Sequence, residues 1–256
     1  MNTLFYFQEC YNSYIARKRF IESKVARHNP SLGYLCLADM MIKNKITRVW
    51  TTNFDALTET AINIINPQQE LLVCSSTNSG SIKNFNPTYP SVCKLHGDFR
   101  YDNLQNTDDE LKALEITLQE HWFHCLTNRG LIVIGYSGND ESIMSFFEKH
   151  ITDPNFISKG LYWTTLKGVP VSNRVSALIE NAKSSGRNAD IVEISTFDSL
   201  LYAIYKSLKF SNQFIEEKST DIKASSELFF SGNHIKKFIK LNVFKADSIP
   251  QCNCFK

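Results

Sequence analysis

The sequence predicts an α/β fold built around a mainly parallel β-sheet, and three observations lead to this prediction. Short β-branched or apolar segments alternate with segments of helical periodicity from about residue 29 to residue 209. The segments that separate most of the expected strands are long enough for helical crossovers, which parallel strands require. In addition, Leu131-Ile-Val-Ile134 is a continuous apolar run, which is typical of a strand that helices cover on both faces.

The first half of the pattern begins with a helix. Asn29-Pro30-Ser31 marks its start, because proline is tolerated where the first backbone N–H groups have no helical partner. Residues 75–90 are rich in Asn, Ser, Gly and Pro, which is typical of a surface loop. The expected elements are, in order, a helix to about Lys43, a strand at 46–52, a helix at 55–65, and strands at 71–74 and 91–95.

The second half begins with a long helix. Thr107 and the acidic residues after it precede apolar residues at helical spacing, and the pattern ends near Gly130. The expected elements that follow are a strand at 131–134, a helix from 141, a strand at 161–165, a helix after 172, a strand at 191–194 and a helix at 198–209. The alternation therefore predicts a Rossmann-like, doubly wound domain over residues 1–209, and a C-terminal helical extension or tail over residues 210–256.

Composition excludes several classes of protein. With 28 Lys and Arg against 26 Asp and Glu, the chain of 256 residues has a net charge of +2, so it lacks the strongly basic character typical of nucleic-acid binding. No window approaches the roughly 18 uninterrupted apolar residues of a membrane span. The first ten residues lack the pattern of a secretory signal. We therefore expect a cytoplasmic protein with no direct nucleic-acid or membrane partner.

The cysteines argue against a zinc module. The seven are Cys10, Cys36, Cys74, Cys93, Cys125, Cys252 and Cys254. Their number is odd, and none of them form a Cys-x-x-Cys pair, whereas a four-cysteine zinc ribbon uses two such pairs. In a reducing cytoplasm they are expected to be free thiols, and no metal site is expected.

Polar residues follow three of the expected strands. These loops are Thr51-Thr-Asn-Phe-Asp55, Lys94-Leu-His-Gly-Asp98 and Gly135-Tyr-Ser-Gly-Asn-Asp140. In open parallel sheets, ligands bind beyond the carboxyl ends of the strands, where helix N-termini point unpaired N–H groups at the ligand. Because all three loops fall at carboxyl ends, they predict one site with an amide, an imidazole and several carboxylates, suited to a sugar or a phosphate.

Each of these residues also fits a purely structural interpretation. Asp55 and Asp140 stand where helix N-caps are expected. Asn53 suits a turn, a single histidine such as His96 is usually structural or solvated, and the glycines of the third loop permit a sharp turn. Only the occurrence of all three loops at one edge of the sheet favours a functional site.

Together and in this order, the three loops resemble the signature motifs of the sirtuin-like superfamily. The versions Thr-Thr-Asn-Phe-Asp and Gly-Tyr-Ser-Gly-Asn-Asp are similar to those of its prokaryotic NAD-hydrolase branch, which is associated with anti-phage defence. The resemblance covers roughly Tyr6 to Leu208. It implies a Rossmann-like fold that binds NAD as a substrate.

The resemblance also implies roles for individual residues. Asn53 would orient the nicotinamide ribose or the attacking water, and His96 would be the general base. Asp55 would hold the nicotinamide carboxamide, and Gly135 with Ser137 would contact the adenosine half. The implied NAD-binding positions are Thr51, Thr52, Asp55, Gly135, Ser137 and Asp140. These roles suit cleavage of an N-glycosidic bond, which needs aligned polar groups and a base that titrates near neutrality, and no metal.

Two departures from the family shape the prediction. Deacylating sirtuins carry two cysteine pairs after the His-Gly motif, and their absence here favours cleavage of NAD by water. The family also begins with a strand and a glycine-rich loop that cradles the pyrophosphate, whereas this chain has no glycine before Gly33. The resemblance therefore predicts a domain that is incomplete at its N-terminus and a sheet that lacks its central strand.

Three hypotheses remain open from the sequence. The first is an NAD hydrolase that acts as an anti-phage defence effector. The second is a truncated, catalytically inactive module that binds a nucleotide or a partner, and the third is a zinc-independent protein deacylase. The resemblance also implies a homo-oligomer or a partner protein of a defence system. The aromatic segment after Phe210 is a candidate docking region for it, and helices that cover the edge of the domain itself explain this segment at least as well.

Overall fold

The structure is a computed structural model, and it describes residues 13, 15–16, 19, 28–75, 89–95, 119, 121–219 and 241–245. The elements in chain order are α3 (Leu32–Ile42), β1 (Ile46–Thr51), α4 (Leu57–Ile65), β2 (Leu72–Ser75), β3 (Ser91–Lys94), β4 (Gly130–Ile134), α7 (Glu141–His150), β5 (Gly160–Leu166), α8 (Asn173–Ser184), β6 (Ala189–Ile194), α9 (Phe197–Ser207), α10 (Gln213–Lys218) and β7 (Leu241–Lys245). From α3 to α9 they match the predicted alternation of strands and helices.

The described strands form one sheet in the order β2-β3-β1-β7-β4-β5-β6. Every pairing between neighbouring strands in this order is parallel. Parallel strands need covering layers on both faces, because the crossover connections place helices there. The predicted α/β class with a Rossmann-like parallel sheet is therefore confirmed.

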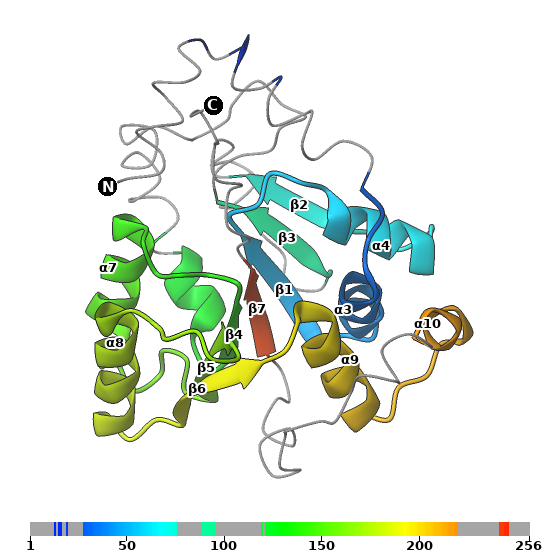
Figure 1. Ribbon diagram of the computed structural model, residues 1–256. Helices are drawn as coiled ribbons and strands as arrows, with labels where there is room; N and C mark the ends of the chain where they lie inside the picture. Colours follow the sequence, from blue (N-terminus) through cyan, green and yellow to red (C-terminus); the bar gives the residue numbers. More distant parts are fainter. Residues whose placement is uncertain are drawn as a thin grey trace, which may run out of the picture.

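Two apolar cores lie on opposite faces of this sheet. Consecutive residues of β1 illustrate the arrangement, since Val49 belongs to one core and Trp50 to the other. This alternation follows from strand geometry, in which successive side chains point to opposite faces. Figure 1 shows α7 and α8 on one side of the sheet, and α3, α4 and α9 on the other. The sheet is thus doubly wound, as predicted.

The central position of the sheet is filled from the C-terminal region. β7 lies between β1 and β4, and Lys245 is in register with both Thr51 and Ile134 (Figure 1). The expectation that the sheet lacks its central strand was therefore wrong. The C-terminal region expected to form a helical extension or tail contributes both α10 and this strand. A division of the chain at residue 209 stays a prediction.

One predicted element falls mainly outside the described residues. Residues 121–126 are helical, as expected for the end of the long helix before β4, but most of that helix lies outside the described residues.

Cys36, Cys74, Cys93 and Cys125 are free and buried, which confirms the expectation for the described cysteines. Across the described ranges, no helix combines the length and the apolar character that crossing a membrane would require.

Candidate active site

The loop after β1 is ordered by hydrogen bonds among its own residues. The backbone N–H of Asn53 donates to Thr51 Oγ1 at 3.0 Å, and Asn53 Nδ2 donates to Asp55 Oδ2 at 3.2 Å. The other carboxylate oxygen of Asp55 accepts from the backbone N–H of Leu57 at 2.9 Å. Thr51 is buried, and Thr52 to Ala56 are half-buried. The amide of Asn53 is therefore held in one orientation at the carboxyl edge of the sheet.

Asp55 lies one position before the N-cap of α4, so the predicted N-cap is off by one residue. The N-cap residue of α4 is Ala56, which has no side-chain hydrogen bond to the helix. Asp55, one position earlier, satisfies the backbone N–H of Leu57 at the first helical position. The same carboxylate also accepts from the Asn53 amide. One side chain therefore contributes both to the start of α4 and to the candidate site.

A buried lysine connects this loop to β3 and α4. Lys94 is the last residue of β3, and its side chain is 0% exposed. Its Nζ donates to the backbone carbonyl oxygen of Asp55 at 2.5 Å and forms an ion pair with Glu59 Oε1 at 3.0 Å. Buried lysines require such partners, since an uncompensated charge in the interior is costly.

The second predicted loop begins beside the first. The backbone N–H of Leu95 donates to the carbonyl oxygen of Thr51 at 2.8 Å, so the chain leaves β3 next to the end of β1. β3 and β1 are neighbouring parallel strands. His96 follows directly in the sequence but lies outside the described residues, and its predicted role as general base stays a prediction.

The third loop, after β4, is held by aromatic packing. Tyr136 is buried, and its ring centroid lies 5.7 Å from that of Trp163. Trp163 Nε1 donates to the Tyr136 carbonyl oxygen at 3.1 Å. Gly135 and Gly138 adopt φ values of 69° and 77°, which confirms that glycine permits a sharp turn here. Burial, followed by the nearby charge of Asp140, raises the pKa of Tyr136, so its hydroxyl group stays protonated.

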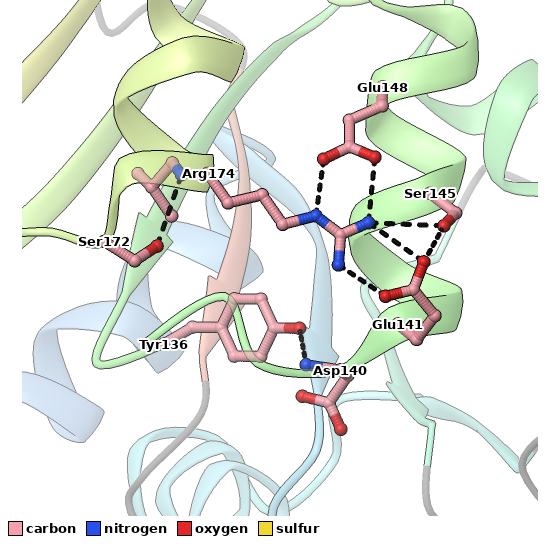
Figure 2. Close-up of polar contacts among 8 residues, drawn as sticks. Tyr136, Asp140, Glu141, Ser145, Glu148, Ser172 and Arg174 are labelled. Carbon is pink, nitrogen blue, oxygen red and sulfur yellow. Dashed lines mark hydrogen bonds and ion pairs between the residues drawn. The ribbon is translucent and has the colours of Figure 1, made fainter.

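The end of this loop leads into α7 (Figure 2). Asp140 is the N-cap residue of α7, as the structural interpretation predicted, but its side chain makes no cap hydrogen bond. Its backbone N–H donates to the hydroxyl oxygen of Tyr136 at 3.3 Å. Ser137, predicted to contact the adenosine half of NAD, is exposed. The loop thus has a buried aromatic residue beneath it and an exposed hydroxyl on its outside.

A charged cluster stands beside the third loop. Figure 2 shows Arg174 of α8 between Glu141 and Glu148 of α7. Arg174 donates to both carboxylates, with Nε to Glu148 Oε1 at 2.5 Å and Nη1 to Glu141 Oε2 at 2.6 Å. These hydrogen bonds lower the pKa of both glutamates. The cluster joins the two helices that cover this face.

The first and third loops lie at the same edge of the sheet, but they are not adjacent. Thr51 and Ile134 both pair with β7, so β1 and β4 are two strand spacings apart, about 10 Å. A ligand that contacts both loops would have to pass over the carboxyl end of β7. That distance suits a dinucleotide rather than a single small group.

Two buried cysteines on this side of the sheet, Cys93 and Cys125, are poorly suited to act as nucleophiles. A hydrogen bond with Cys74, together with burial, raises the pKa of Cys93, and burial raises the pKa of Cys125 to about 11. Since the thiolate is the reactive form, these residues are inert at neutral pH. Within the described ranges, no group of three or more His, Cys, Asp and Glu side chains is arranged to hold a metal ion.

Sequence reasoning missed the roles of Lys94 and Glu59. In the sequence, Lys94 stands out only as the first residue of the second motif. One signal was available, because Lys94 follows the apolar residues Val92 and Cys93 in a strand expected to be buried, where a lysine needs a partner. Nothing in the local sequence identified Glu59, which is on a different element, as that partner.

The comparison with known families agrees with this geometry. The SIR2-like domain matches residues 47–184, which is more than half of the chain and includes all three loops. No curated protein shows significant similarity to the chain. SIR2-like domains use NAD. The match begins within β1 and extends to the end of α8, and therefore covers the strands from which the three loops emerge. The chain belongs to the SIR2-like domain family.

Proposed function

We propose that this protein is an NAD hydrolase that cleaves the bond between nicotinamide and ribose, and that it acts as an effector of anti-phage defence. The observation that carries the proposal is the arrangement of Asn53 in the loop after β1, where Asp55 accepts from its side-chain amide and Thr51 accepts from its backbone N–H. It lies in a chain of the SIR2-like domain family, whose members use NAD. An amide held in advance is what stabilisation of a charged transition state requires.

The reaction needs few groups. Cleavage builds positive charge on the C1′ carbon of the ribose, and water attacks this carbon as its bond to nicotinamide breaks. The bonding electrons move to the pyridinium nitrogen, so nicotinamide leaves as a neutral molecule. The proton of the water passes to a base, the proposed role of His96. Asn53 is proposed to orient the ribose or the water, with Thr51, Thr52, Asp55, Gly135, Ser137 and Asp140 around the dinucleotide.

The test compares four proteins in an assay of nicotinamide release. Wild type is expected to release nicotinamide from NAD. Asn53→Ala is expected to lower kcat by about 100-fold or more, and His96→Ala by a similar factor. Tyr205→Phe serves as a folded control. The Tyr205 hydroxyl donates to Asp39 near the end of α3, and α3 leads into the amino end of β1, whereas the candidate site lies at the carboxyl end. Unchanged release by Asn53→Ala and His96→Ala would refute the proposal.

A specific observation favours a second candidate, a binding module without turnover. The strand at the centre of the sheet is β7, and residues 246–256 after it contain no glycine. A glycine-rich turn after a central strand is the usual cradle for a pyrophosphate. Calorimetry that detects NAD binding, together with no nicotinamide release, would support this candidate over the hydrolase.

The defence role rests on the resemblance of the motifs and requires a test in cells. Expression of the protein in a bacterium exposed to phage is expected to lower cellular NAD during infection and to limit phage production. Asn53→Ala is the matched control, because the protein stays present while the proposed chemistry is removed. Equal phage production with wild type and Asn53→Ala would contradict this role even if the isolated protein cleaves NAD.

A further inference from the structure

The charge of Lys94 is retained in an unusual place. Its side chain is fully buried at the end of β3, and Glu59 of α4 is only 11% exposed. Buried ion pairs contribute little net stability, because removing two charges from water offsets most of their attraction. Apolar side chains of similar volume would stabilise this position at least as well. The pair therefore needs an explanation other than stability.

The contacts of Lys94 lead to the candidate site. Its Nζ binds both the Glu59 carboxylate and the backbone carbonyl oxygen of Asp55. The side chain of Asp55 in turn binds Asn53 Nδ2 and the N–H of Leu57. Lys94 of β3, distant in sequence, thus binds the backbone of the residue whose carboxylate holds the Asn53 amide, and Glu59 of α4 pairs with that lysine.

The hydrogen-bond donor to the Asp55 carbonyl oxygen is a buried side chain. The carbonyl of Asp55 belongs to a non-helical stretch between β1 and α4. Lys94 supplies the donor, and Glu59 balances the charge. Without this donor, the Asp55 peptide loses a hydrogen bond that restricts its orientation, and the side chain of Asp55 is the group that binds the Asn53 amide.

We propose that Lys94 is a positioning residue, which fixes the loop after β1 through the Asp55 carbonyl oxygen so that the Asn53 amide is held in its working orientation. The effect on catalysis rests on the proposed NAD hydrolase activity. The effect on the loop does not, so the two can be tested separately.

The first test measures amide hydrogen exchange in residues 52–57. Lys94→Met is expected to accelerate exchange of the Asn53 and Leu57 amides by about tenfold or more, because the hydrogen bonds of the loop then open more often. Tyr205→Phe, which loses a buried hydrogen bond elsewhere, is expected to leave these amides unchanged. Unchanged exchange in a folded Lys94→Met protein would overturn the proposal.

A second variant guards against failure to fold. Lys94→Met leaves the Glu59 carboxylate buried without its lysine, so Lys94→Met/Glu59→Gln removes both charges together. The double variant still lacks the donor to Asp55, and the proposal predicts the same accelerated exchange at Asn53 and Leu57. Wild-type exchange rates in this double variant would overturn it.

The second test is a kinetic cycle with Asn53. Lys94→Met/Glu59→Gln is expected to lower kcat for nicotinamide release by about 10- to 100-fold, with KM changed by less than about threefold. In an Asn53→Ala background, the same pair of changes is expected to lower kcat no further, because Lys94 acts through Asn53. Additive effects would overturn the proposal. If wild type releases no nicotinamide, the proposed function fails, and hydrogen exchange alone decides the positioning role.

Discussion

The loop after β1, residues 52–56, and the loop after β4, residues 135–140, leave the same edge of the sheet but are held by different interactions. The first is fixed by polar contacts, including the buried Lys94 at the Asp55 carbonyl oxygen. The second rests on the packed rings of Tyr136 and Trp163 and turns at two glycines. At one edge of the sheet, the loop that carries the Asn53 amide is thus held by directional hydrogen bonds, whereas the loop after β4 is held mainly by apolar packing.

The largest expected effect is on the polar side of this comparison. Lys94→Met should destabilise the protein by about 3–5 kcal/mol, because it leaves a nearly buried Glu59 carboxylate without its charge partner. Urea unfolding measures this change. Lys94→Met/Glu59→Gln should recover most of the loss, since no uncompensated charge remains. A double variant as unstable as the single one would show that the charge is not the cause.

The next effect concerns the turn of the β4 loop. Gly138 has φ of 77°, and an added Cβ would lie 2.7 Å from Val175 Cγ2 of α8. Gly138→Ala should therefore cost about 2–4 kcal/mol from backbone strain plus overpacking. Gly186 is a matched control with φ of 78° and no atom within 4 Å of an added Cβ, so Gly186→Ala should cost only about 1–2 kcal/mol. Equal losses in the two variants, compared by urea unfolding, would show that the packing of α8 does not constrain the loop.

A smaller effect is expected at Tyr136. Tyr136→Phe keeps the ring against Trp163 but removes the acceptor for the Asp140 N–H. The loss should be about 1 kcal/mol, which lowers Tm by about 2–4 °C in a protein of this size. If thermal unfolding shows no change, aromatic packing alone holds the loop.

The smallest effect is expected at the charged cluster. Arg174→Met should cost less than about 1 kcal/mol near neutral pH, because the glutamates are largely exposed and screened by solvent. Hydrogen bonds from Arg174 lower the pKa of Glu141 and Glu148 in the folded protein. Their contribution is thus present above the ordinary pKa of 4.5 and is lost as the pH falls through the lowered values. Urea unfolding from pH 7 to pH 3 should show the two proteins converging in acid.

Local patterns were sufficient to predict most of the described sheet and helices. Apolar runs such as 131–134 identify a strand covered on both faces, and the two aspartates before α4 and α7 marked helix starts within one residue. These features depend on neighbours in the sequence. The three polar loops could likewise be assigned to one edge, because parallel strands all end there.

Features set by distant partners could not be predicted. β7 has five residues, and its place in the sheet depends on pairing with β1 and β4, which no local pattern specifies. The burial of Lys94 could not be predicted for the same reason. A lysine is usually exposed, and its burial here depends on Glu59, which lies on a different element. The first and third loops therefore leave the sheet at the predicted edge, the contacts that hold them could not be predicted, and the functional roles of their residues stay predictions.

The proposed cleavage of NAD by water is tested most directly by measuring the yield of both products. The purified full chain is incubated with NAD, and nicotinamide and ADP-ribose are quantified over time. We predict that the two accumulate in equal amounts as NAD disappears, and that Asn53→Ala forms both about 100-fold more slowly or slower still. NAD that remains intact while bound to a folded wild-type protein would contradict the proposed hydrolase activity.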